Sequence, residues 1–133
     1  MVKVMKADNS KKFFIGYDSK EDIAYRVCKN SLINSSSINV KVIALKQAEL
    51  RYRGLYYRTA DPLASTEFTY TRFLIPSLMN FNGWAVFCDC DLVFLKDVKE
   101  LFSNLSEKYA VYCVKHDYSP SEKHKMDGRQ QTI

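Results

Sequence analysis

Residues 84–91 constrain the fold most strongly, because an apolar run ends there in two acids spaced two residues apart. The run is too short for an ordinary helix and suits a buried strand. On an extended strand, side chains i and i+2 share a face, so Asp89 and Asp91 project together while Cys88 and Cys90 point the other way. Two carboxylates placed in this way suit a hard cation, Mg²⁺ or Mn²⁺. The same spacing also arises when one Asp caps a turn and the other is solvated, so both interpretations are open.

The composition is that of a globular chain. At 133 residues, folding buries roughly two-thirds of the extended-chain surface. A hydrophobic content of 47% and an aromatic content of 14% argue against disorder. The formal charge of +5 is scattered among acids, which fits either a phosphate-bearing ligand or a generic solubilising surface. We predict one domain over residues 1–133, with a polar start at 1–11 and an irregular tail at 116–133.

The sequence predicts a cytoplasmic protein without a transmembrane segment. Its start lacks the apolar region of a signal peptide, and no apolar run approaches the roughly 20 residues of a membrane span. The four cysteines include no Cys-x-x-Cys pair, and three of them lie in apolar surroundings. Reduced and mostly buried thiols are therefore expected.

Strands and helices are predicted to alternate. Residues 12–18 read as a strand, a helix capped by Ser19 follows and ends at 34–37, and residues 40–45 form a second strand. This order is a βαβ unit with a parallel pair. The remaining predicted elements are a short helix and loop over 46–62, a helix over 65–79 interrupted by Pro76, the strand ending at the acids, an extended run over 92–95, a short helix capped by Asp97 and a strand over 109–115.

Ligands of α/β sheets gather at the carboxyl ends of the strands, where several polar residues fall. Tyr17 and Asp18 can stack on a base and accept a hydrogen bond, or they are a strand-terminal aromatic and a turn residue. Arg72 can grip a phosphate in a planar fork, or it is a surface side chain. His116 and Asp117 can contact a ligand, although a solvated turn explains them as well.

Other chemistries lack their motifs. The sequence has no Gly-x-x-x-x-Gly-Lys loop, no Gly-x-Gly-x-x-Gly and no Gly-x-Ser-x-Gly elbow. Tyr and Arg alternate over 51–58, which can stack on single-stranded nucleic acid. A half-buried aromatic loop explains the same residues, so no nucleic-acid partner is predicted.

Taken together, three blocks resemble metal-dependent nucleotide-sugar glycosyltransferases of the GT-A fold, nearest to the glycogenin and lipopolysaccharide galactosyltransferase type. The blocks are residues 13–18, 71–76 and 83–91, the last continued by 94–101, in the family's order. The resemblance covers roughly residues 12–133. It implies a three-layer α/β/α fold with a mostly parallel, Rossmann-like sheet.

The resemblance also implies roles for particular residues. Asp89 and Asp91 would be the Asp-x-Asp motif holding Mn²⁺ or Mg²⁺ against the donor diphosphate, a cation that stabilises the leaving group by several kcal/mol. Tyr17 and Asp18 would lie against base and ribose, with Arg72 near the diphosphate. No catalytic residue is assigned. The implied donor-binding set is Tyr17, Asp18, Arg72, Asp89, Cys90 and Asp91.

The implied activity is transfer of a hexose from a UDP-sugar to a saccharide, lipid-linked or protein acceptor. The sequence stops where the family pattern would continue into an acceptor site, which predicts an N-terminal piece or a truncated relative. The alternative is a non-catalytic nucleotide-sugar-binding module. A nucleotidyltransferase would carry a Gly-rich loop after its first strand, and this loop is absent.

Overall fold

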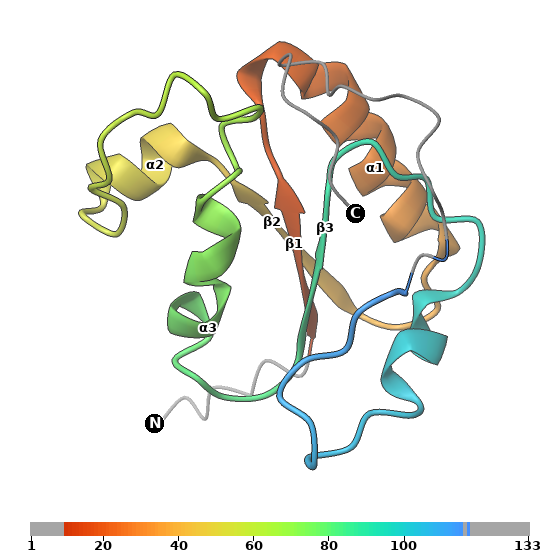
Figure 1. Cartoon of the computed structure of the whole chain (residues 1–133). Helices are drawn as coiled ribbons and strands as arrows, with labels where there is room; N and C mark the ends of the chain where they lie inside the picture. The colour runs from red at the N-terminus through yellow and green to blue at the C-terminus, as the bar shows by residue number, and fades with distance from the viewer. Residues whose placement is uncertain (1–9, 116, 118–133) are drawn as a thin grey trace, which may run out of the picture.

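The sheet at the centre of the molecule has three parallel strands. The computed structural model describes residues 10–115 and 117. Its strands are β1 (Lys11–Gly16), β2 (Val40–Leu45) and β3 (Ala85–Cys88), in the order β2-β1-β3 (Figure 1). The central strand β1 pairs with both neighbours in parallel. The predicted α/β class with a parallel sheet is confirmed.

The first crossover joins β1 to β2 through α1 (Asp22–Ser35), which a short 3₁₀ helix, η1 (Ser19–Glu21), precedes. The prediction that Ser19 caps this helical segment is wrong, since Asp18 lies at the N-cap and accepts a hydrogen bond from the Lys20 N–H. Ser19 instead donates its hydroxyl to Glu67 over 2.6 Å. Asp18 takes the cap because its backbone is extended, as an N-cap requires.

The second crossover joins β2 to β3 through α2 (Gln47–Tyr52), a long loop, the 3₁₀ helix η2 (Thr71–Leu74) and α3 (Ile75–Leu78). The predicted short helix after residue 46 is confirmed. The helix predicted over 65–79 is helical only in its second half. The Thr69 hydroxyl accepts the Thr66 N–H, a side-chain bond that competes with helix formation. Pro76 lies in the first turn of α3, where its missing N–H does no harm.

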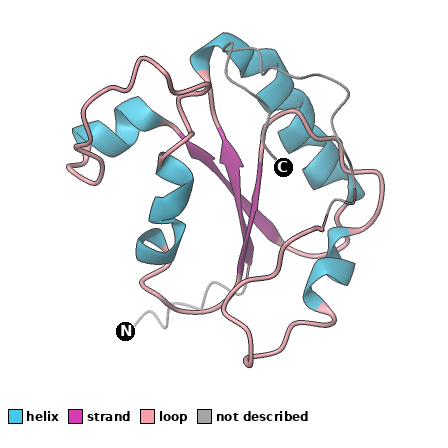
Figure 2. Cartoon of the chain, in the orientation of Figure 1, coloured by secondary structure: helices cyan, strands magenta, loops and turns pink. Residues whose placement is uncertain are grey.

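Two apolar clusters hold helices against opposite faces of the sheet. Because side chains alternate along a strand, Phe13 and Ile15 pack on the side of α1, with Cys28 and Leu32. Phe14 points the other way, into a cluster with residues of α2 and α3. Figures 1 and 2 show α1 on one side of the strands, and α2 and α3 on the other.

The chain after β3 has little regular structure. Asp97 caps the 3₁₀ helix η3 (Val98–Phe102) by accepting the Lys99 N–H, so the predicted short helix is confirmed. The strand predicted over 109–115 is wrong, since this segment pairs with no strand among the described residues. Residues 92–95, predicted as an extended run, form no regular element. Val111 and Val114 of this segment are 71% and 81% exposed.

The predicted polar start and the predicted tail lie mostly outside the described residues. Of the predicted tail, residues 116 and 118–133 lie outside the described part of the chain, as do residues 1–9 of the polar start. No helix within residues 10–115 is long and apolar enough to cross a membrane.

Candidate functional site

The candidate site lies where β1 and β3 end. After β1 the chain turns into α1 on one face of the sheet, whereas β3 is reached from α3 on the other face (Figure 2). Such a divergence is the topological switch point at which open parallel sheets bind ligands. The register pairs Ile15 with Cys88, so the segments beginning at Tyr17 and Asp89 leave the sheet side by side.

Arg72 of η2 reaches across this edge to Asp89. Its Nη2 lies 3.5 Å from Asp89 Oδ1, and its Nε donates to the Phe68 carbonyl over 3.5 Å. The guanidinium lies 5.2 Å from the Phe68 ring centroid and 5.0 Å from that of Phe87. These two rings hold the cation by cation–π attraction and fix its direction. At 32% exposure, the Arg72 side chain remains accessible to a ligand.

Asp89 and Asp91 differ in their surroundings. The Asp89 side chain is 47% exposed overall, yet its Oδ1 is shielded from solvent and accepts no hydrogen bond among the described residues. The contact with Arg72 is therefore an ion pair without hydrogen-bond geometry. Thr71 Oγ1 is a second buried oxygen without a partner in the described part of the chain. Asp91 is exposed.

Asp18 has a structural role at this edge. It is 6% exposed, and its two carboxylate oxygens accept the N–H groups of Lys20 over 2.9 Å and Glu67 over 3.1 Å. The carboxylate thus ties the start of η1 to the loop before η2. No motif in the sequence indicates the contact with Glu67, which lies 49 residues further along the chain.

Tyr17 is half-buried at the carboxyl edge of the sheet, and part of its ring is accessible to solvent. Its hydroxyl donates to Asp22 over 3.0 Å, and this bond, with desolvation, raises the pKa of Tyr17. Its ring meets Tyr25 edge-on at 5.2 Å, and the Lys46 ammonium lies 4.7 Å from its centroid. Lys46 directly follows β2, a position that could have marked it in the sequence as a residue of the carboxyl edge.

Cys90 is 1% exposed and faces the interior. Its thiol donates to Glu21 over 3.2 Å, and burial together with this neighbour raises the pKa of Cys90 to about 12. A neutral thiol at this position joins the turn after β3 to η1. In this conformation Cys90 makes no surface that a ligand can reach.

The predicted metal site does not fit the residues present. Within the described ranges, no group of three or more His, Cys, Asp and Glu side chains is placed to hold a metal ion. Asp89 already faces a guanidinium, which would repel a cation, and Asp91 is solvated. The prediction of a manganese-binding Asp-x-Asp motif is therefore wrong. His116 lies outside the described residues, and Asp117 is exposed.

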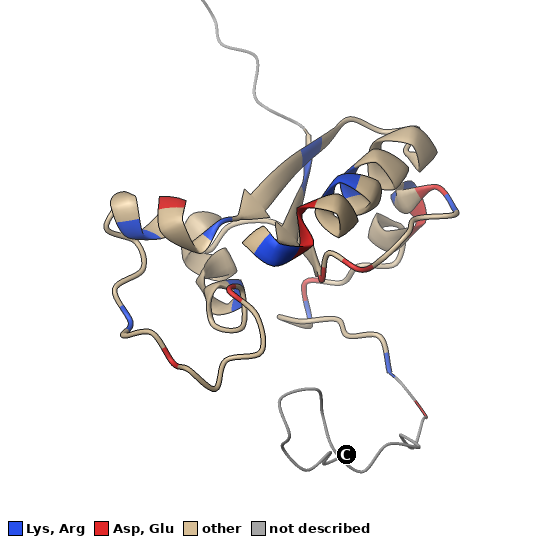
Figure 3. Cartoon of the chain, turned by 90° about the horizontal axis from the view of Figure 1, so that it is seen from above, with Lys and Arg blue, Asp and Glu red and all other residues tan. Residues whose placement is uncertain are grey.

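Charge at this edge is mixed. Figure 3 shows Lys and Arg interspersed with Asp and Glu along the described chain. Arg72 and Lys46 bring positive charge to a region where Asp18, Asp22 and Asp89 supply negative charge. Arg72 is consequently the group best placed to meet an anionic ligand.

Fold and site define the chain as a small α/β protein with a parallel sheet and a polar carboxyl edge. It is similar to the curated Protein CDI of Arabidopsis thaliana, with 49% identity over 122 residues, which is 92% of this chain and 47% of that protein. The chain thus spans about half the length of the curated relative it matches. No protein-family model matches the chain. No solved structure matches it either.

These comparisons correct the functional prediction. The matched relative is named Protein CDI, which is not a glycosyltransferase name, and no family or structural match supports a GT-A fold. The predictions of a GT-A glycosyltransferase and of a hexose-transferring enzyme are therefore wrong. The alternative, a non-catalytic nucleotide-sugar-binding module, gains no clear support. The blocks that suggested the family are two strands with the turns that follow them and the short helical segment η2–α3, which a parallel α/β sheet produces for its own structural reasons.

Proposed function

We propose that this domain binds a phosphate-bearing small molecule of the nucleotide class at the carboxyl edge between β1 and β3. The observation that carries the proposal is Arg72, whose guanidinium is held over Phe68 and Phe87 and whose side chain is one-third exposed. The arrangement of helices on both faces, which we propose to be a three-layer α/β/α fold, puts this side chain at the switch point.

A phosphate can replace Asp89 as the partner of Arg72. The Arg72–Asp89 pair is partly exposed and lacks hydrogen-bond geometry, and pairs of this kind contribute about 0–1 kcal/mol. A phosphate can accept two parallel N–H bonds from the guanidinium, which is the stronger arrangement.

Neighbouring groups support the remaining parts of the ligand. The Tyr17 ring offers a surface for a planar base, and the exposed Lys46 adds a second positive charge over that ring. Mn²⁺ or Mg²⁺ enters the proposal only as an ion that the phosphate brings with it, and a UDP-sugar is one of the candidate ligands. A cytoplasmic location is also part of the proposal and rests on the unpaired thiols.

Calorimetric titration with UDP, ADP, UDP-glucose and inorganic phosphate, each with and without Mg²⁺ or Mn²⁺, tests the proposal. Saturable binding of at least one nucleotide is expected. Arg72→Ala should weaken it roughly 10- to 100-fold, because a hydrogen bond to a charged group contributes about 1.5–3 kcal/mol. The nucleotide affinity of Arg72→Lys should lie between those of the parent and Arg72→Ala, since Lys keeps the positive charge and loses the planar pair of N–H donors.

Arg53→Ala is the matched control. Arg53 lies at the end of α2, away from Arg72, and its side chain is 54% exposed. Its removal should leave nucleotide affinity unchanged. Absence of binding by every nucleotide, or equal affinity in Arg72→Ala, would overturn the proposal.

A further inference from the structure

An open cavity lies at the amino end of the sheet, opposite the edge that carries the proposed nucleotide site. Its volume of about 510 Å³ falls within the range of about 300–1,000 Å³ that is usual for small-molecule sites. Lys11 and Lys12 begin β1 and line the cavity together with the turn that leads into β3. Because neither Arg72 nor Lys46 lines it, an inference about this cavity is independent of the nucleotide site.

Trp84 forms an aromatic wall whose orientation is fixed. Its Nε1–H donates to a carboxylate oxygen of Glu107 over 3.2 Å, and its ring meets the ring of Tyr112 edge-on with the centroids 5.4 Å apart. Met79, at the other end of the turn, adds a flexible apolar side chain to the lining, and its sulfur can contact an aromatic ligand. A flat apolar group can therefore pack on Trp84 without the entropic cost of ordering the indole.

The charge of the lining is positive. Among the described residues, the lining contains two lysines and no Asp or Glu. The Lys11 ammonium lies 5.1 Å from the centroid of the Phe102 ring, a contact that leaves its charge uncompensated. Even when Glu107, which accepts the indole N–H of Trp84, is counted with the lining, positive charge exceeds negative charge. The lining therefore favours a ligand that carries an acidic group.

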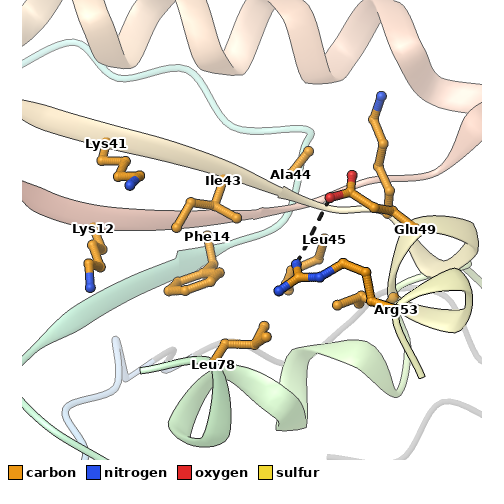
Figure 4. A pocket seen from close by; sticks show the side chains of 11 residues that line it. Lys12, Phe14, Lys41, Ile43, Ala44, Leu45, Glu49, Arg53 and Leu78 are labelled. Atoms are coloured by element: carbon orange, nitrogen blue, oxygen red, sulfur yellow. Dashed lines mark ion pairs between the residues drawn. The ribbon is translucent and has the colours of Figure 1, made fainter. Parts of the chain in front are cut away.

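Lys12 is the lysine best placed to meet that group. In the described part of the chain it takes part in no ion pair and no cation–π contact. It also borders a smaller cavity over the Phe14 face, where Glu49 pairs with Arg53 at the end away from Lys12, as Figure 4 shows. Lys41, its register partner on β2, has an interaction of its own and does not line the larger cavity. The charge of Lys12 is thus available to a ligand.

The turn beside the cavity has a strained backbone. Asn80 and Phe81 have φ angles of 51° and 53°, in the left-handed region that bulky side chains rarely adopt. A hydrogen bond of 3.1 Å from the Asn82 N–H to the Met79 carbonyl holds the turn. Burial of Phe81 does not compensate for the strain, since this residue is 83% exposed. Such strain is often retained at binding sites, and here the turn brings Asn82 and Trp84 into the lining.

We infer that this cavity binds a small aromatic acid. The ring packs on Trp84 beside Met79, the acidic group meets the Lys12 ammonium, and Lys11 adds positive charge. The amide of Asn82 offers a further hydrogen bond to a polar substituent. At about 30 Å³ for each water-sized group, the volume of about 510 Å³ holds roughly 17 such groups, which is enough for an acid with two fused rings.

NMR titration of the whole chain with naphthalene-2-carboxylate tests the inference. The chain contains one Trp, so its indole N–H gives one identifiable signal that reports on the cavity wall. Saturable shifts are expected for this signal and for the backbone amides of Lys11, Lys12 and Asn82. Absence of a saturable shift at these positions would overturn the inference.

Variants of the lining separate the contributions of charge and ring. Lys12→Met should weaken binding about tenfold or more, because the carboxylate loses a charged hydrogen-bond donor. Trp84→Leu, followed through the Lys12 amide, should weaken it roughly fivefold, whereas Trp84→Phe keeps a ring and should weaken it less. Lys96→Met is the matched control, since it removes an exposed lysine outside the lining and should leave affinity unchanged. Should Lys12→Met fail to give a folded amide spectrum, Lys12→Gln provides the same test.

Two further ligands and one further variant complete the design. Acetate has the acid without the ring, and 2-naphthylmethylammonium has the ring with the opposite charge, so both should bind at least tenfold more weakly. Arg72→Ala should leave the affinity for naphthalene-2-carboxylate unchanged, because Arg72 does not line this cavity. Equal binding by either control ligand, unchanged affinity in Lys12→Met, or loss of binding in Arg72→Ala would each contradict the assignment.

Discussion

At the scale of single residues, Gly16 determines how closely the Phe68 ring can approach the end of β1. It is the last residue of β1, and a Cβ added there would lie 2.5 Å from Cδ2 of Phe68. The same Phe68 ring lies under the Arg72 guanidinium. The absence of a side chain at residue 16 therefore allows the ring, and with it the cation, to approach the carboxyl edge of the sheet.

Gly16→Ala should destabilise the protein by about 1–3 kcal/mol, because the new methyl group pushes the Phe68 ring out of a packed position. Urea unfolding followed by circular dichroism measures the loss. By moving Phe68, the variant should also weaken nucleotide binding. Gly83→Ala is the contrast: its φ of +73° strains the backbone, but nothing lies within 4 Å, so only stability should fall. A Gly16→Ala protein as stable as the parent would show that the ring moves freely.

The sequence anticipated one contact between the candidate residues and missed others for a physical reason. Arg72 and Asp89 were expected near one another, and the structure brings them together. Asp18 and Cys90 were expected to face a ligand, but each is buried by a partner distant in sequence, Glu67 and Glu21 respectively. Strand periodicity predicts which face a side chain takes. It does not predict which loop covers that face.

At the scale of elements, η3 is held by the Asp97 cap. The Asp97 carboxylate accepts hydrogen bonds from the Ser37 hydroxyl and N–H and from the Lys99 N–H. The bond from the Ser37 hydroxyl, followed by that from the Lys99 N–H, lowers the pKa of Asp97 to about 2. One carboxylate thus starts η3 and joins it to the segment between α1 and β2.

The pH dependence of stability should reveal this cap. Because the pKa is about 2 in the folded protein and 3.8 ordinarily, the folded state binds fewer protons than the unfolded state between these values. Stability from Asp97 is therefore present above pH 3.8 and declines as the pH falls toward 2. Urea unfolding at several pH values measures this effect. In this window the free energy of unfolding of Asp97→Asn should change less with pH than that of the parent protein. Parallel curves would contradict the role of the cap.

Element prediction succeeded where local sequence and tertiary contact agree. The apolar runs of β1, β2 and β3 alternate between two cores, so their pattern was readable in the chain. Residues 109–115 have a similar β-branched and aromatic pattern, but they are exposed and pair with no described strand. A strand requires a neighbour, which propensity alone does not supply.

At the scale of the whole molecule, the cysteines report on the integrity of the core. Cys28 of α1 and Cys88 of β3 are both buried, with their sulfurs 4.0 Å apart. Their hydrogen bond, together with burial, raises the pKa of Cys88. Cys90 is buried as well, whereas Cys113 is exposed. Three thiols thus depend on the packing of α1 and the turn after β3 against the sheet, and one does not.

Alkylation should separate these thiols by rate. In the native protein iodoacetamide should modify Cys113 quickly and the three buried thiols only through opening of the structure, because the reagent cannot reach a thiol that is shielded from solvent. Peptide mass spectrometry measures each rate. Cys113→Ser should abolish the fast phase and leave the others unchanged. Added urea should accelerate Cys28, Cys88 and Cys90 together, since one cooperative opening exposes all three. Faster alkylation of Cys90 alone would contradict this expectation and mean that the turn after β3 opens separately. The segment that carries Asp89 would then be a locally unstable part of an otherwise intact fold.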